Sequence, residues 1–183
     1  ELAGAEVYGI ETDGRDLVVL TGDHQAGTPQ GHYALTEAFL DVAEDLDADQ
    51  IFALGGVPTG ELIEEYDVVG AVTAAGQKAD LEAAGVEFPE DEPAGGIVGV
   101  SGLLLGLGDR RGVEAACLMG ETSGYLVDPK SARAVIEVLQ ELLDFSVDYS
   151  SLEEQAEEME EVVRQMEELE QGQSQAAAED LRY

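Results

Sequence analysis

The stretch AGGIVGVSGLLLGLGDRRGVEAACLMGETSGY, residues Ala94–Tyr125, decides the fold of this chain. Ile97–Val100 and Val113–Met119 show no alternation of polar and apolar residues, with Glu114 the one charged residue in them, and a glycine-punctuated helical segment lies between them. A strand that is covered on both faces lacks the alternation of polar and apolar residues that a half-exposed strand shows. The stretch therefore predicts two buried strands joined by a short helix, with small and polar residues where the second strand ends.

Strand and helix patterns alternate along the rest of the chain. Val7–Ile10 and Leu17–Leu20 flank a turn-like segment and predict a hairpin, while Ile51–Leu54 and Tyr66–Thr73 predict further strands. The segments 29–46, 77–84 and 129–145 are predicted to be helical. This alternation favours right-handed crossovers and a mostly parallel sheet with helices on both faces, which is an α/β fold.

Local signals mark the ends of these helices. Thr28-Pro29 and Asp128-Pro129 each place a capping side chain before a proline at the first helical position. Gly85 follows the helix over residues 77–84 and is the residue type that ends a helix in a left-handed conformation. The loops Gly55–Gly60 and Gly120–Tyr125 are expected to follow buried strands.

The composition is that of one domain with an appendage. With 183 residues and 44% hydrophobic content, the chain can bury a sizeable core, which we assign to residues 1–148. The single Cys117 lies within an apolar strand, so we interpret it as a buried structural thiol rather than a nucleophile. The sequence contains no run of 18 apolar residues and no secretory signal, which favours a cytoplasmic location without membrane insertion.

Charge is the strongest feature of the whole chain. Forty-one Asp and Glu face eight Lys and Arg, giving a net charge of −33. Self-repulsion of this size destabilises a compact state, whereas multimolar salt shortens the screening length to about 3 Å. The composition is similar to that of proteins from salt-accumulating halophilic archaea; an acidic protein that binds basic partners is the alternative. Six scattered arginines cannot form a basic footprint, which disfavours nucleic-acid binding.

The C-terminal part has a different composition. Ser150 or Ser151 is expected to cap an acidic helix over residues 149–171, with Ser151 and Glu154 forming a capping box. Its apolar residues recur with the 4-3-4-3 spacing of a narrow seam, and they are Leu152, Ala156, Met159, Val163 and Met166. The seam either lies on its own domain or joins subunits. Residues 172–183 form a polar, flexible tail that ends in Tyr183.

The strand ends are where a doubly wound sheet would bind a ligand. Loops from His24 to Thr28, from Gly55 to Thr59, from Thr73 to Lys78 and from Gly120 to Tyr125, together with Ser101-Gly102, are predicted to form this rim. The residues of the expected rim pocket are His24, Thr59, Ser101, Glu121, Thr122 and Tyr125.

Known catalytic motifs are missing from this rim. The glycines satisfy neither a phosphate-binding loop nor a dinucleotide fingerprint, and Gly99-Val100-Ser101-Gly102-Leu103 lacks the final glycine of a nucleophile elbow. Two histidines, His24 and His32, form no metal-binding pattern. We therefore assign no catalytic residue, cofactor or metal. The alternative is an enzyme, ligase or phosphorylase-like, that acts on a small carboxylate or nucleoside at the rim.

The central stretch nevertheless resembles a known family. The segment Gly96–Leu105, then Arg111–Thr122, Gly124-Tyr125 and Asp128-Pro129-Lys130 occur in the order found in archaeal members of the proteasome assembly chaperone family, relatives of the eukaryotic assembly chaperone 2. The likeness spans residues 17–145 and extends more weakly into the acidic helix. It implies a three-layer sandwich that is similar in fold to nucleoside phosphorylases.

The resemblance also implies a function and a partner. Members are homo-oligomeric chaperones or adaptors that contact the α-subunits of the 20S proteasome, through a C-terminal hydrophobic–Tyr–any tripeptide. Here the corresponding residues are Leu181, Arg182 and Tyr183, with tyrosine last rather than penultimate. A docking role for Tyr183 in this form of the motif requires residues beyond it. The resemblance thus predicts a non-enzymatic assembly chaperone of a halophilic archaeon.

Overall fold

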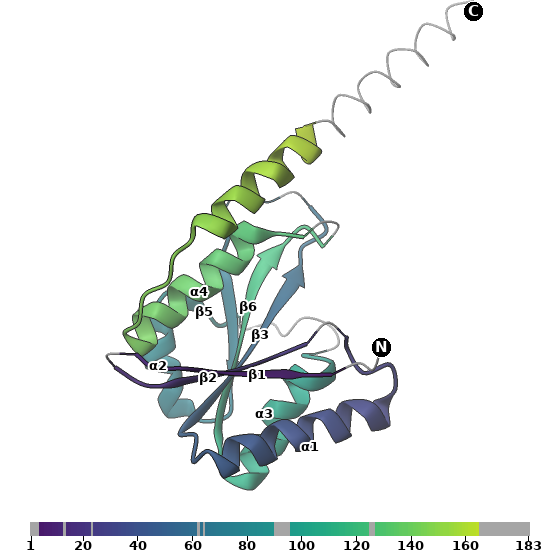
Figure 1. Ribbon diagram of the computed structural model, residues 1–183, viewed down its shortest axis with the longest axis vertical. Coiled ribbons are helices and arrows are strands. Elements are labelled where there is room, and N and C mark those ends of the chain that lie inside the picture. The colour runs from purple at the N-terminus through teal and green to yellow at the C-terminus, as the bar shows by residue number, and fades with distance from the viewer. Residues whose placement is uncertain are drawn as a thin grey trace, which may run out of the picture.

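The computed structural model of the chain describes residues 4–12, 14–22, 24–61, 63, 65–89, 96–124 and 127–164 (Figure 1). These residues contain six strands and four helices whose two ends are both defined, and a further helix covers residues 150–164. In chain order the bounded elements are β1 (Glu6–Ile10), β2 (Leu17–Thr21), α1 (Pro29–Asp45), β3 (Gln50–Pro58), β4 (Val68–Val72), α2 (Ala75–Ala83), β5 (Val86–Glu87), α3 (Gly99–Arg111), β6 (Glu114–Thr122) and α4 (Pro129–Leu143).

The strands form two separate sheets. β1 and β2 pair antiparallel, which confirms the predicted hairpin. The central sheet has the order β3-β6-β4-β5, with β3 parallel to β6 and β4 parallel to β5. β4 and β6 are antiparallel, so the sheet is mostly but not wholly parallel.

Helices cover both faces of the central sheet, and this makes three layers (Figure 1). On one face, Leu40 of α1 and Leu104 of α3 pack with Cys117 of β6. On the other face, Leu81 of α2 and Val135 of α4 belong to the same buried cluster as Ala116 and Leu118 of β6. Successive residues of β6 alternate between the two faces, as the pleat of a strand requires, and both faces are apolar. The predicted α/β class is confirmed.

The helix starts follow the predicted capping chemistry. The Thr28 hydroxyl accepts a hydrogen bond from the Gly31 backbone N–H at 3.1 Å, and Pro29 opens α1. The Asp128 carboxylate accepts from the Ser131 N–H at 3.2 Å, and Pro129 opens α4. Each cap satisfies a donor that the first helical turn leaves without an intrahelical partner.

The prediction of a strand at Ile97–Val100 is wrong. Val98 is 79% exposed and is the N-cap of α3. Gly99, the first residue of α3, has a φ of +77°, which turns the backbone into the helix. The turn is tight, because a Cβ atom on Gly102 would lie 2.0 Å from the Ile97 carbonyl oxygen. A short apolar run fits the start of a helix as well as a strand, so its pattern alone does not distinguish them.

The first residues of two predicted loops are instead the ends of strands. β3 extends through Gly55 and Gly56 to Pro58, and β6 extends through Gly120 to Thr122, because these residues continue the parallel ladder between the two strands. The glycines therefore do not mark loops here; Gly56 lies opposite Gly120 within the sheet.

The start of the C-terminal helix also differs from the prediction. Residues 150 and 151 are already helical, and the Asp148 carboxylate accepts a hydrogen bond from the Ser150 backbone N–H at 2.9 Å. Asp148, rather than a Ser151 box, therefore satisfies the donor at this helix start. The predicted seam residue Met166 and the tail 172–183 lie outside the described residues.

Candidate functional site

The structure brings three of the predicted rim residues together. Pro58 of β3 pairs with Thr122 of β6, so the carboxyl ends of these parallel strands are adjacent. The Thr59 backbone N–H donates to the Thr122 carbonyl oxygen at 2.9 Å. The Thr59 hydroxyl donates to the Glu61 carbonyl at 3.1 Å. Thr59, Glu121 and Thr122 thus lie together at one strand end. The hydroxyl groups of Thr59 and Thr122 are both hydrogen-bonded to backbone groups.

The other rim predictions do not join this group into a catalytic arrangement. His24 is exposed between β2 and α1, and Ser101 is half-buried in the first turn of α3. Tyr125 lies outside the described residues. In the described ranges, neither His24 nor Ser101 forms a hydrogen bond with a rim residue. Within the same ranges, no group of three or more His, Cys, Asp or Glu side chains is placed to hold a metal ion.

The loop that begins at Thr73 lies at the opposite end of the strands from Thr59 and Thr122. The Thr73 hydroxyl donates to the Ala115 carbonyl at 3.2 Å and accepts from the Ala115 N–H at 3.1 Å, at the beginning of β6. The rim prediction placed Thr73–Lys78 beside Thr59 because it took the strand before Thr73 to run in the same direction as its neighbours. The antiparallel pairing of β4 with β6 reverses the direction of β4 and corrects this placement.

Cys117 lies in the middle of β6 and is fully buried. Burial raises the pKa of its thiol to about 11. Because the thiolate is the nucleophilic form, this environment makes the side chain unreactive near neutral pH. The structure confirms the prediction of a buried structural thiol.

The β1–β2 hairpin presents an apolar surface that the sequence did not reveal. Its exposed apolar side chains are Val7, Tyr8, Ile10, Val18 and Val19. A two-stranded hairpin is marginally stable in water unless it packs against something else. The close approach of its turn to the end of α4 supplies one anchor, because a Cβ atom on Gly14 would lie 3.2 Å from the Asp144 carbonyl oxygen. The strands themselves keep their apolar side chains in solvent, which is typical of an interaction surface.

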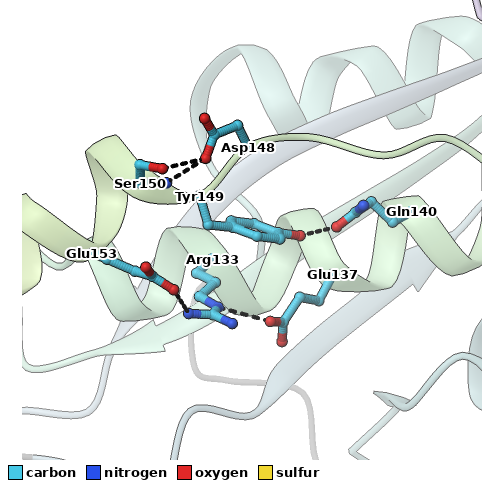
Figure 2. A network of polar contacts seen from close by, with 7 residues as sticks. All are labelled: Arg133, Glu137, Gln140, Asp148, Tyr149, Ser150 and Glu153. Carbon is cyan, nitrogen blue, oxygen red and sulfur yellow. Dashed lines mark hydrogen bonds and ion pairs between the residues drawn. The ribbon is translucent and has the colours of Figure 1, made fainter.

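The helix over residues 150–164 lies against α4 (Figures 1 and 2). Its half-buried residues are those of the predicted seam, Leu152, Ala156, Met159 and Val163, while the residues between them are exposed. This placement agrees with the alternative in which the seam lies on its own domain. Glutamates that follow the seam along one side reach cations of α4: Glu160 pairs with Lys130 at 2.5 Å and Glu153 with Arg133 at 2.8 Å.

Arg133 is the centre of the contact between the two helices (Figure 2). Its guanidinium bonds Glu137 within α4 and Glu153 on the C-terminal helix, both at 2.8 Å, and lies over the Tyr149 ring. The Tyr149 hydroxyl in turn donates to the Gln140 side-chain oxygen. These contacts turn the chain back after α4 and set the direction in which the C-terminal helix leaves the domain.

A model of the PAC2 family matches residues 1–167. The chain belongs to the PAC2 family. An uncharacterized protein of Methanocaldococcus jannaschii is 36% identical to it over 185 residues, which are 98% of this chain and 70% of that protein.

Two solved structures resemble this PAC2 family chain over most of its length. PbaB of Pyrococcus furiosus, an archaeal proteasome activator, has a TM-score of 0.81 and 36% identity, over 91% of this chain and 72% of PbaB. PbaA of Pyrococcus furiosus, an archaeal homolog of proteasome-assembly chaperone, has a TM-score of 0.72 and 25% identity, over 94% of this chain and 76% of PbaA. The resemblance seen in the central stretch is thus confirmed at the level of the family.

The cations of this PAC2 family chain are few, and most are paired. Of the seven in the described ranges, Lys78, Arg111, Lys130, Arg133 and Arg164 form ion pairs. Within those same ranges Arg15 and Arg110 form none. No helix in the described part of the chain has the length and apolar character needed to cross a membrane.

Proposed function

We propose that this protein is a non-enzymatic chaperone or adaptor for assembly of the 20S proteasome, which acts as a homo-oligomer and contacts the proteasome α-subunits. The observation that carries the proposal is the match to PbaB, an archaeal proteasome activator, at 36% identity and a TM-score of 0.81. The match to PbaA, a homolog of proteasome-assembly chaperone, supports the same partner.

The chain offers surfaces that suit such a role. The exposed apolar side chains of the hairpin make it a candidate for association between subunits, since several large apolar side chains exposed on one element favour contact with another protein. We assign contact with the α-ring to Leu181, Arg182 and Tyr183 at the end of the polar segment 172–183. Several tails on one oligomer would bind a symmetric ring with higher avidity than a single tail.

We further propose the setting and the remaining architecture. The net charge of −33 supports the cytoplasm of a halophilic archaeon as the place of action. Residues 1–148 are the core domain, residues 149–171 the acidic helix and residues 172–183 the tail. The layered sheet is consistent with the expected likeness to nucleoside phosphorylases.

The partner is tested by mixing the protein with proteasome α-rings in high salt and measuring complex formation by sedimentation velocity. Full-length protein is compared with a variant that ends at Gln171. Binding by the full chain and its loss on truncation are expected. Binding that survives truncation contradicts only the role of the tail, whereas a full chain that never binds the rings contradicts the chaperone function.

Oligomerisation is tested separately with the hairpin. Tyr8 and Val19 lie directly opposite each other in the register, so their side chains share one face. The double variant Tyr8→Thr, Val19→Thr keeps strand propensity but removes apolar surface, and it is expected to lower the oligomer mass measured by light scattering. Leu46→Thr, at another exposed apolar residue, is the control. An unchanged mass in the double variant excludes this face of the hairpin as the subunit interface.

A further inference from the structure

A cleft opens at the edge of the domain opposite the strand-end rim. It has a volume of about 350 Å³ and is bounded by the turn before β2, the start of β3, α2 and the end of α4. In Figure 1 the turn between β1 and β2 lies beside α2 and the end of α4, which is where these elements meet. The volume lies within the range of pockets that hold small organic ligands.

Groups of both charges line this cleft. Arg15 comes from the hairpin turn, Asp80 from α2 and Glu141 from α4. Among the described residues none of these three forms an ion pair, although acids outnumber bases fivefold in this chain. An arginine without a carboxylate partner is available to bind an anionic group, and the two carboxylates are available to bind a cationic one.

The cleft also contains a polar group that the protein leaves unsatisfied. Gln77 of α2 is 8% exposed and lines the cleft, and its side-chain oxygen is buried without a hydrogen-bond partner among the described residues. Such an orphaned group costs on the order of 1–3 kcal/mol. Rotation of the side-chain amide toward a bound polar ligand would remove that cost.

The rest of the lining is apolar. Phe52 of β3 and Leu142 of α4 contribute to the wall, and both also pack against the buried cluster beneath the cleft. A ligand that satisfies every part of the lining carries an anionic group, a cationic group and an apolar group within a small volume.

We propose that this cleft binds a small zwitterion, namely an α-amino acid with an apolar side chain. Its carboxylate pairs with Arg15, its ammonium with Asp80 or Glu141, and its side chain packs on Phe52 and Leu142. The lining of this cleft includes none of the predicted rim residues and none of the residues assigned to the α-ring contact, so the proposal does not depend on the proteasome role.

The probe is L-leucine, compared by isothermal titration calorimetry with two analogues that each lack one charge, 4-methylpentanoate and 3-methylbutylamine. All titrations use one fixed salt concentration, at which circular dichroism shows the chain to be folded. Leucine is expected to bind saturably, and each analogue at least about tenfold more weakly. If leucine produces no saturable heat, or if either analogue binds as well as leucine, the proposal is overturned.

Variants then place the binding in this cleft. Arg15→Gln is expected to weaken leucine binding at least fivefold, while Arg110→Gln, at the other described arginine without an ion pair, leaves it unchanged. Gln77→Met keeps the side-chain length and is expected to weaken binding without loss of thermal stability. If Arg15→Gln lowers the melting temperature but leaves the leucine affinity unchanged, Arg15 contributes only to stability and the proposed site is wrong.

Discussion

Gly120 of β6 lies directly beneath Ser131 of α4, so that a Cβ atom on Gly120 would be 2.4 Å from the Ser131 hydroxyl oxygen and 2.8 Å from its carbonyl oxygen. The close approach lets Ser131, which is 5% exposed, lie on the sheet without a gap. The N-terminal part of α4 that this contact places also carries Lys130 and Arg133, which pair with glutamates of the C-terminal helix.

We expect Gly120→Ala to destabilise the protein by about 1–3 kcal/mol, because the added methyl group overlaps helix backbone that cannot move independently. The measurement is the free energy of unfolding from chemical denaturation at fixed salt. Gly106→Ala in α3 is the matched control, since no atom lies within 4 Å of its Cβ position; it should stabilise by about 0.5–1 kcal/mol. Equal effects of the two substitutions would contradict the close contact.

Arg133→Gln is expected to loosen the C-terminal helix while the domain stays folded. The substitution removes the ion pair to Glu153 of the helix and the contact with the ring of Tyr149, which precedes the helix. Hydrogen exchange should become faster across residues 150–160 and stay unchanged in β6. Arg164→Gln, whose ion pair to Glu161 lies within the same helix, serves as the control. Faster exchange in β6 would indicate general destabilisation instead.

The attachment of this helix should weaken in acid. A hydrogen bond from Lys130 lowers the pKa of the Glu160 carboxyl below its ordinary value of 4.5, and the Ser150 hydroxyl lowers the pKa of Asp148 below 3.8. Since the folded pKa values are depressed, their stabilising contribution is present above the ordinary values and is lost as the pH falls through the folded ones.

Carboxyl NMR titration of Glu160 checks this sign. Lys130→Gln should return its pKa toward 4.5, whereas Lys78→Gln, which removes an ion pair to Glu82 on α2, should have no effect. A Glu160 pKa that does not respond to Lys130→Gln would show that the ion pair is absent in solution.

Cys117 should report on unfolding of the whole domain. Because burial raises the pKa of its thiol to about 11, an aromatic disulfide reagent at pH 8 should modify it only after the chain unfolds. The rate of modification of the native protein is therefore expected to follow the rate of unfolding and to rise with denaturant. Modification of the native protein as fast as that of the denatured chain would show that β6 is accessible.

Stability should increase steeply with salt. At a net charge of −33, repulsion between carboxylates opposes folding in dilute buffer and is screened at multimolar salt. The thermal midpoint, measured by circular dichroism, is expected to rise between 0.1 and 3 M KCl by far more than for a neutral protein. A midpoint independent of salt would remove the physical basis for a halophilic origin.

The sequence by itself determined the α/β class, the hairpin and the starts of α1 and α4, because caps such as Thr28-Pro29 and Asp128-Pro129 act within a few residues. It also determined the spacing of the seam, since residues on one face of a helix recur with the helical period.

Only the tertiary structure decided the remaining features, because each depends on residues distant in sequence. Because β4 pairs antiparallel with β6, Thr73 lies away from the rim. Because Gly56 pairs with Gly120, residues that were predicted to begin loops belong to strands. The backbone turn at Gly99 makes Ile97–Val100 the approach to a helix, although its apolar pattern fits a strand equally well. The cleft beside Gln77 has no local signal, because its lining comes from four separate elements.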